Sequence, residues 1–355
     1  MSEQRKSIPR MRDVALEANV SLSTASRILR GVGERYAAGT RKRVYEASQK
    51  LGWRKNRLVS IMQSGKTKTI GVMIPPYDSF WVEVLYGIHA ALAEAGYLPI
   101  TIWPTGCDKL GEFERQKAEG FELINELLDR RVDGLLLWPA YAVAFCDHFR
   151  ELSERAVPMG AIEHIFPKEQ GADIVETDER QAADIVANHL VNLNHRRIAC
   201  LSTREITAQT WAVSRRKLLE EAVQRHQNTL YKSWRLNEAG DNGLQVAREV
   251  LTSSFKPTAV FCVSDHEARL IYRAADELAI RIPEDVSVVG FGNLDFSETL
   301  TPRLATFDRK PKLMGRLLAA LLVERLSNPD QQPASVRVAP TFIEGCSTSP
   351  AAEMQ

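Results

Sequence analysis

Near the N-terminus, hydroxyl and arginine side chains recur on one face of a short predicted helix. Ser21 is a good N-cap for a helix over residues 22–29, since its hydroxyl can accept a backbone N–H. The inner, apolar face of that helix carries Ala25, Ile28 and Leu29. Its outward face carries polar side chains: Ser23, Ser26, Arg27 and Arg30. Hydroxyls at a helix start can bind phosphates and arginine can pair bidentately with guanine, so this face is typical of a helix that enters the major groove of DNA.

Individual contacts with DNA follow from these positions. We expect Ser21, Thr24 and Ser26 to contact the phosphate backbone. We expect Leu22, Ser23 and Arg27 to contact the edges of bases, and Arg30 extends the same face. The alternative, that these are ordinary solvent-facing helix residues, stays open, more so for Ser23 than for Arg27.

Two further helices are expected to hold this face in place. Residues 12–18 put Val14, Ala15 and Ala18 on one apolar stripe. A third helix should start at Thr40 as its N-cap and end at Gly52, with inner positions Val44, Ala47 and Leu51. Because Ala15 and Ala25 are small, the first two helices can approach closely across a tight turn, which is the arrangement of a helix-turn-helix.

The near-neutral charge of the whole chain hides a division along its length. The chain has 355 residues, 46 Lys and Arg, and 45 Asp and Glu. Residues 1–66 hold 15 of the basic residues and only five of the acidic ones, a net charge of +10, which leaves −9 for the remainder. A small basic module before a large acidic body indicates a polyanion-binding surface, although a solvated charged face is the plainer explanation of charge alone.

After Lys66, short apolar runs alternate with helical stretches. The runs are 70–74, 98–103, 132–138, 197–201, 259–263 and 286–291, and helical patterns include 80–95 and 179–193. This alternation predicts parallel sheets with helices on both faces. The expected fold is therefore an all-α helix-turn-helix headpiece (1–55), a linker (56–67), and an α/β body of two doubly wound lobes, beginning with 68–165 and 166–297.

Ligands of open parallel sheets bind beyond the carboxyl ends of the strands. That rule nominates residues 75–81, Trp103, Trp138, His164, Asp265 and the loop 292–295. Indole faces can stack on a sugar ring, while carboxylates, arginines and amides hydrogen-bond its hydroxyls. Trp103 and Trp138 could equally belong to the core.

Several segments in order resemble the lactose/galactose (LacI-type) repressor family. They are MRDVALEANVSLSTASRILRG, TRKRVYEASQKLGWRKN, SGKTKTIGVMIP, VETDERQAADIVANHLVNLNHRRIACL, KPTAVFCVSDHEA, IRIPEDVSVVGFGN and TPRLATFDRKPKLMG. The resemblance implies that the first module binds DNA, and that a body like periplasmic sugar-binding proteins senses a small molecule and dimerises. It also implies that residues 298–327 return to the first lobe and 328–349 to the second.

The resemblance adds candidate residues to the ligand site. Arg215 matches the family arginine in the segment that starts at Trp211, and Asp265 ends FCVSD. Asp78, Phe80 and Trp81 match the family's Asn-Pro-Phe-Phe segment. Arg215 could instead be a surface helix residue.

The linker resembles the hinge helix of the family, which orders on operator DNA. Residues 56–64 are capped by Asn56, and Met62 stands where the family usually has the leucine that enters the minor groove. Val59 and Ser60 depart from the family pattern. A plain flexible linker is the alternative, because a helix of this length is marginal in water by itself.

One departure bears on the ligand. Many family members have two acidic residues after Gly-Phe or Gly-Tyr, and this chain has Gly292 and Asn293. We include Asn293 in the site. The loss of an anion near Arg215 suggests the hypothesis that a negatively charged ligand, such as a sugar acid, is bound.

Several other classes of protein are disfavoured. The longest apolar stretches are far shorter than the ~20 residues of a membrane span, and the N-terminus has no apolar signal region, so we expect a cytoplasmic protein. Five scattered cysteines without CxxC argue against disulfide scaffolds and cysteine zinc sites. GxSxG, P-loop and HExxH motifs are absent, and we expect no catalysis, cofactor or metal.

The pattern as a whole predicts a sequence-specific transcriptional regulator, a repressor that binds a palindromic operator as a homodimer. A small sugar, sugar acid or sugar phosphate would control it. The alternatives are a sugar-binding module without DNA regulation and, with less support, a sugar-modifying α/β enzyme.

Overall fold

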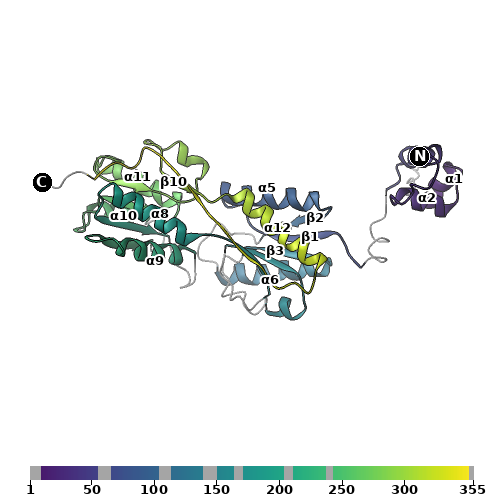
Figure 1. The fold of residues 1–355 in the computed structure, drawn as a ribbon, viewed down its shortest axis with the longest axis horizontal. Helices are drawn as coiled ribbons and strands as arrows, with labels where there is room; N and C mark the ends of the chain where they lie inside the picture. Colours follow the sequence, from purple (N-terminus) through teal and green to yellow (C-terminus); the bar gives the residue numbers. More distant parts are fainter. Residues whose placement is uncertain are drawn as a thin grey trace, which may run out of the picture. The chain divides into compact units, whose positions relative to one another are not determined.

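The computed structural model divides the chain into two compact units, Met1–Thr67 and Lys68–Gln355. It describes residues 9–54, 65–103, 113–138, 150–163, 171–203, 211–236 and 243–351 (Figure 1). Within these ranges, no helix is long and apolar enough to cross a membrane.

The first unit contains the three predicted helices, which are α1 (Met11–Glu17), α2 (Leu22–Leu29) and α3 (Ala38–Leu51). Their core is small and apolar: Val14, Ala15, Ala18, Ala25, Ile28, Val44 and Ala47. Gly52 ends α3 with a φ of 64°, as expected. The predicted start of α3 is wrong, because its N-cap is Ala37 and Thr40 lies inside the first turn.

The larger unit begins with a six-stranded parallel sheet in the order β11-β5-β4-β3-β1-β2. Its strands are β1 (Thr69–Met73), β2 (Leu98–Thr101), β3 (Gly134–Leu137), β4 (Met159–Ile162), β5 (Asp173–Thr177) and β11 (Ser335–Val338). One face packs against α5 (Ser79–Glu94) and α12 (Pro311–Ser327). The other face packs against α6 (Phe113–Asp129). Figure 1 shows these layers, which form the first lobe.

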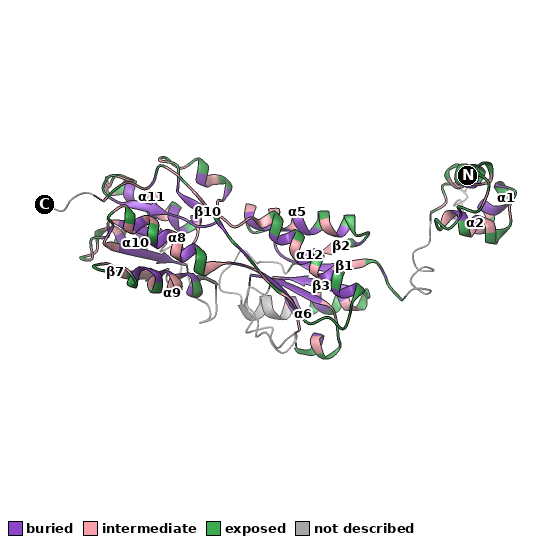
Figure 2. Ribbon diagram, in the orientation of Figure 1, coloured by how far each residue is buried: buried purple, intermediate pink, exposed green. Residues whose placement is uncertain are grey.

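The second lobe is built on a parallel sheet of order β7-β6-β8-β9. Its strands are β6 (Arg197–Ser202), β7 (Leu230–Arg235), β8 (Ala259–Cys262) and β9 (Ser287–Val289). The helices α8 (Glu179–Asn192) and α9 (Trp211–Gln224) cover one face, and α10 (Gly243–Thr252) and α11 (Asp265–Glu277) cover the other. Figure 2 shows both sheets buried between their helices. The 3₁₀ helix η2 (Asp295–Glu298) follows β9.

Strand pairing moves the lobe boundaries away from those expected. Strands β5 and β11 were assigned to the second lobe but belong to the first sheet, because Val175 and Val338 join its core. Conversely, β10 (Thr306–Asp308) pairs with β12 (Thr341–Ile343), and Phe307 joins the core of the second lobe. In the described part, the chain therefore passes between the lobes three times, around 178, 309–310 and 339–340.

Candidate nucleic-acid interface and ligand site

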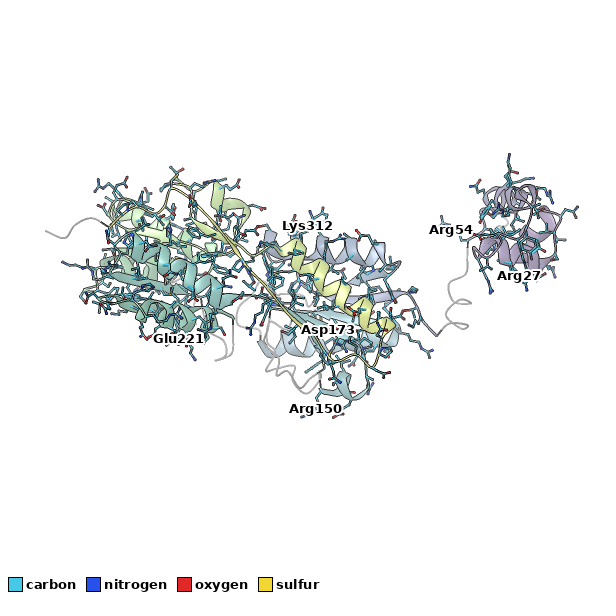
Figure 3. The ribbon with its side chains drawn as sticks, in the orientation of Figure 1. Arg27, Arg54, Arg150, Asp173, Glu221 and Lys312 are labelled. Atoms are coloured by element: carbon cyan, nitrogen blue, oxygen red, sulfur yellow. The ribbon has the colours of Figure 1, made fainter. Side chains whose placement is uncertain are left out.

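Helix α2 presents the predicted DNA-binding face to solvent. Ser21 is the N-cap, and its Oγ accepts from the Thr24 backbone N–H at 3.1 Å. Beside it, Leu22 exposes 52% of its surface, and Ser23 is exposed as well. Arg27 is exposed on the outside of the headpiece (Figure 3), and so is Arg30 at the end of the helix. The exposed arginines and the hydroxyls of this capped helix are therefore accessible to a partner such as DNA.

Two of the predicted phosphate contacts are less accessible. Thr24 and Ser26 are half-buried. The hydroxyl of Thr24 lies 2.8 Å from that of Ser21, so it also serves the cap of α2. Asn56 and Met62 lie outside the described residues.

The headpiece keeps its positive charge in the described residues. Residues 9–54 contain ten Lys and Arg against four Asp and Glu. Two lysines are paired on its surface, Lys50 with Glu17 at 2.7 Å and Lys42 with Glu46 at 3.8 Å. Such exposed pairs leave much of the field available to phosphates.

In the first lobe, the predicted ligand residues gather at the start of α5. Asp78 is the N-cap of this helix and accepts from the backbone N–H of Trp81 at 3.3 Å. The rings of Trp81 and Trp138 lie 4.3 Å apart, and Tyr77 meets Trp138 edge-on at 5.1 Å. Within the described residues, the buried indole N–H of Trp138 has no hydrogen-bond partner. These aromatic residues lie together at the edge where we expected a ligand, and their contact with a ligand stays a prediction.

Phe80 is buried against a cation that the sequence analysis did not single out. The Arg309 guanidinium carbon lies 3.7 Å from the centre of the Phe80 ring. Arg309 also pairs with Glu163 at 2.5 Å, and Glu163 accepts from the Thr177 hydroxyl at 2.7 Å. Glu163 has a φ of 57°, which is unusual for a residue other than glycine and is often found at functional sites. A buried Arg–Glu pair 146 positions apart leaves no local sequence signal.

In the second lobe, Arg215 is buried rather than on a helix surface. Its guanidinium forms a two-point ion pair with Glu179 and donates to the carbonyl of Val263. The central carbon of the Arg215 guanidinium lies 3.5 Å from the ring centre of Phe291. The partner carboxylate, Glu179, was missed because it stands on another helix.

Asp265 has a structural role instead of the predicted contact with a ligand. It has no exposed surface, and its carboxylate accepts from the Leu294 backbone N–H and the hydroxyls of Ser297 and Thr306 at 2.6–2.8 Å. A carboxylate that holds the segment after β9 in this way is not available to a ligand. His164 lies outside the described residues, and so does the side chain of Trp211, the first residue of α9.

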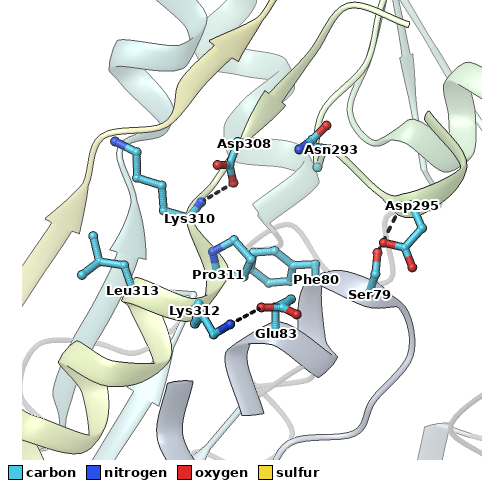
Figure 4. A pocket seen from close by; sticks show the side chains of 11 residues that line it. Ser79, Phe80, Glu83, Asn293, Asp295, Asp308, Lys310, Pro311, Lys312 and Leu313 are labelled. Atoms are coloured by element: carbon cyan, nitrogen blue, oxygen red, sulfur yellow. Dashed lines mark hydrogen bonds and ion pairs between the residues drawn. The ribbon is translucent and has the colours of Figure 1, made fainter. Parts of the chain in front are cut away.

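Asn293 lies where the two lobes meet. It lines a pocket of about 440 Å³ together with Phe80 and Lys310 (Figure 4). Asn293 and Lys310 have φ values of 50° and 57°, in the left-handed region. Nearby, the Asp295 backbone N–H donates to the Ser79 hydroxyl at 3.3 Å, which joins η2 to the start of α5.

A contact between a histidine and a carboxylate also joins the lobes. His266 of α11 lies 3.5 Å from the Asp78 carboxylate, and this carboxylate raises the pKa of His266. Burial raises the pKa of the neighbouring Glu267, whose carboxylate accepts from the Ser264 hydroxyl at 2.5 Å. No group of metal-ligating side chains is found in the described ranges.

Two family models match the chain. Residues 10–56 match the bacterial regulatory proteins of the lacI family, and residues 187–348 match a periplasmic binding protein-like domain. The HTH-type transcriptional repressor PurR of Vibrio atlanticus (strain LGP32) is 25% identical over 340 residues, which cover 94% of this chain and 97% of that protein. The repressor of the same name from Escherichia coli O1:K1 / APEC is 26% identical over 348 residues, with coverage of 94% and 95%.

Solved structures share the fold. The lac repressor dimer bound to operator and the anti-inducer ONPF has a TM-score of 0.77 and 20% identity, over 96% of this chain and 99% of that one. A LacI family transcriptional regulator from Enterococcus faecium with bound ribose has a TM-score of 0.65 and 26% identity, over 80% and 100%.

Proposed function

The chain belongs to the LacI family of bacterial regulatory proteins, and we propose that it represses transcription as a homodimer bound to operator DNA. The matched proteins are transcriptional regulators, not enzymes. The exposed face of α2, with Arg27 at its centre, is the observation that carries the proposal. Two identical headpieces require a palindromic operator, since the symmetry of the protein is mirrored in the half-sites.

Within the headpiece, we propose that Leu22, Ser23 and Arg27 read bases. Ser21 and Arg30, with lesser contributions from Thr24 and Ser26, would contact phosphates. Asn56 and Met62 remain our candidates for a hinge that enters the minor groove. As functional divisions, we propose the headpiece to residue 55, the hinge 56–67, and the two lobes with the boundaries that strand pairing gives.

We further propose that a small sugar or sugar-derived molecule binds between the lobes. Asp78, Phe80, Trp81 and Trp138 approach from the first lobe, and Asn293 from the second. The aromatic faces and the pocket beside Phe80 and Asn293 support this site. His164 and Trp211 stay candidates. A bacterial repressor acts on the chromosome, so we place the protein in the cytoplasm.

Operator binding provides the test of this function. Selection from random duplexes should yield a palindrome, and the full-length protein should bind one half-site much more weakly than two. Arg27→Ala should cost about 1–3 kcal/mol on the selected operator and relax the preference at one base pair in each half-site.

The matched control is Lys42→Ala, which removes an exposed cation of α3 instead of α2. It should leave the base preference unchanged. An equal loss for Arg27→Ala on every sequence would show that Arg27 contacts only phosphate, and failure to enrich any duplex would refute the repressor proposal.

A further inference from the structure

The arginine that the family resemblance puts in the ligand site already has a carboxylate partner in this chain. Arg215 Nε donates to Glu179 Oε2 at 2.7 Å, and Nη2 donates to Oε1 at 2.5 Å. The exposed fraction of the two side chains is 3% for Arg215 and 14% for Glu179. This parallel, two-point geometry is the strongest that an arginine forms with a carboxylate.

The partner comes from a part of the chain that links the lobes. Glu179 is the first residue of α8, directly after the passage from β5 into the second lobe. The loop after β9, where many family members carry two acidic residues, has Gly292 and Asn293 instead. Glu179 therefore supplies, from another element, a carboxylate beside Arg215.

The pocket in front of this pair is lined by charged side chains of both signs. Glu179 lines a pocket of about 310 Å³ with three other carboxylate residues, Glu163, Glu176 and Asp178, and with Arg180 and Arg337. The Glu163 carboxylate is in turn paired with the buried Arg309 at 2.5 Å. Glu176 pairs with Arg337 at 2.8 Å. Arg215 and Arg309 are not among the described residues that line the pocket, but each is paired with a carboxylate that is.

This arrangement disfavours an anionic ligand. To reach Arg215, a ligand carboxylate or phosphate must displace Glu179 and leave a second anion beside it, in a region of low dielectric where like charges repel strongly. A neutral hydroxyl meets no such penalty, since a carboxylate can accept about four hydrogen bonds and Arg215 uses two of those on Glu179.

We propose that Glu179 determines the class of ligand, so that the site takes a neutral, hydroxyl-rich molecule and rejects sugar acids and sugar phosphates. The inference rests on the proposed ligand site between the lobes, and Phe291 and Arg309 link the pair to that site. Arg215 and Arg309 lie 3.5 and 5.9 Å from the ring centre of Phe291, and Arg309 lies 3.7 Å from that of Phe80. It replaces the hypothesis, drawn from the sequence, that the loss of acidic residues after Phe291 favours an anion.

The test frees Arg215 and offers it a small anion. Glu179→Ala removes the carboxylate and leaves room for acetate, so acetate should raise the unfolding midpoint of this variant by roughly 3 °C or more over chloride at equal ionic strength. The native chain should not respond to acetate. Glu221→Ala is the matched control, because Glu221 pairs with Arg180 at 3.4 Å on an exposed surface, and it should also show no response.

The double variant Glu179→Ala with Arg215→Ala should lose the response to acetate. An acetate response in the native chain equal to that of Glu179→Ala would overturn the proposal. A folded Glu179→Ala without any response, or a double variant that keeps the response, would also overturn it.

A second measurement on the native chain decides the matter if Glu179→Ala does not fold. The unfolding midpoint of the native chain is measured with neutral aldoses and with the aldonic acid and the phosphate of each. A rise with a parent sugar that exceeds the rise with its acid and its phosphate supports the proposal, and an equal or larger rise with an acid or phosphate refutes it. Neither measurement involves DNA, so a failure of operator binding would contradict the repressor function separately.

Discussion

At the scale of single residues, one ion pair between the lobes should make stability depend on pH. Asp78 raises the pKa of His266 above its usual value of about 6.5. Glu267 acts in the same direction, whereas desolvation and Arg269 oppose it. A histidine with a raised pKa stabilises the folded state fully below its unfolded pKa, and this contribution is lost as pH rises through the folded pKa.

We therefore expect His266→Gln to lower stability at pH 5.5 and to have little effect at pH 8.5. The loss should be at most about 1 kcal/mol, because 46% of the His266 side chain is exposed and solvent screens the pair. Denaturant unfolding at both pH values measures it. Asp78→Asn keeps an N-cap for α5 and completes a double-mutant cycle, in which a coupling energy that does not change with pH would contradict the assignment.

The ligand residues show how far sequence reasoning reaches at this scale. The rule that ligands bind beyond the carboxyl ends of parallel strands selected both Trp81 and Trp138, and the two rings are neighbours in the structure, because parallel strands end at one edge of the sheet. The same rule selected Asp265, but its carboxylate accepts three hydrogen bonds from groups within the protein. The pairing of Arg215 with Glu179 joins two helices 36 positions apart, and neither local spacing nor charge pattern reveals it.

At the scale of elements, a single carboxylate fastens α12 to the sheet of the first lobe. Asp173, the first residue of β5, accepts from Arg325 Nε at 2.7 Å and Nη2 at 2.5 Å, and also from the Ala334 backbone N–H at 2.9 Å. The exposed fraction of the side chains is only 10% for Arg325 and 3% for Asp173. Asp173→Asn leaves the arginine buried without its counter-charge, and we expect a loss of about 3–5 kcal/mol.

Glu94→Gln is the control for this prediction. Glu94 of α5 forms a two-point pair with Arg316, which stands on the same helix α12 as Arg325. Both side chains are exposed, so the loss of this pair should lower stability far less than Asp173→Asn does. Calorimetric unfolding of both variants gives the comparison. Equal losses would mean that burial does not set the strength of these pairs.

Elements with continuous apolar runs were predicted well, and lobe membership was not. Strands β1 (TIGVM) and β6 (RIACLS) are apolar over most of their length, whereas β5 (DIVET) and β11 (SVRV) contain charged residues between or beside the apolar ones. Periodicity identifies a strand from its own residues, but the sheet that it joins depends on contacts with distant strands. The family resemblance implied repeated passages between the lobes, but their positions became visible only in the structure.

At the scale of the whole molecule, the division after Thr67 separates a basic unit from an acidic one, and it follows the proposed hinge in the sequence. The family resemblance implies that Met62 inserts between base pairs in the minor groove, where unstacking is offset by the contacts that bending allows. Met62→Gly removes the apolar side chain and favours an unfolded linker. We expect its affinity for the selected operator to fall about tenfold or more, which is roughly 1.4 kcal/mol, with a smaller bend angle. The unfolding midpoint of the body should stay unchanged. Fluorescence anisotropy measures the affinity, and a circular-permutation gel shift measures the bend angle. Met62→Leu is the control, because it keeps an apolar side chain at this position. A Met62→Gly protein that binds and bends the operator like the native chain would show that this linker only tethers the two units.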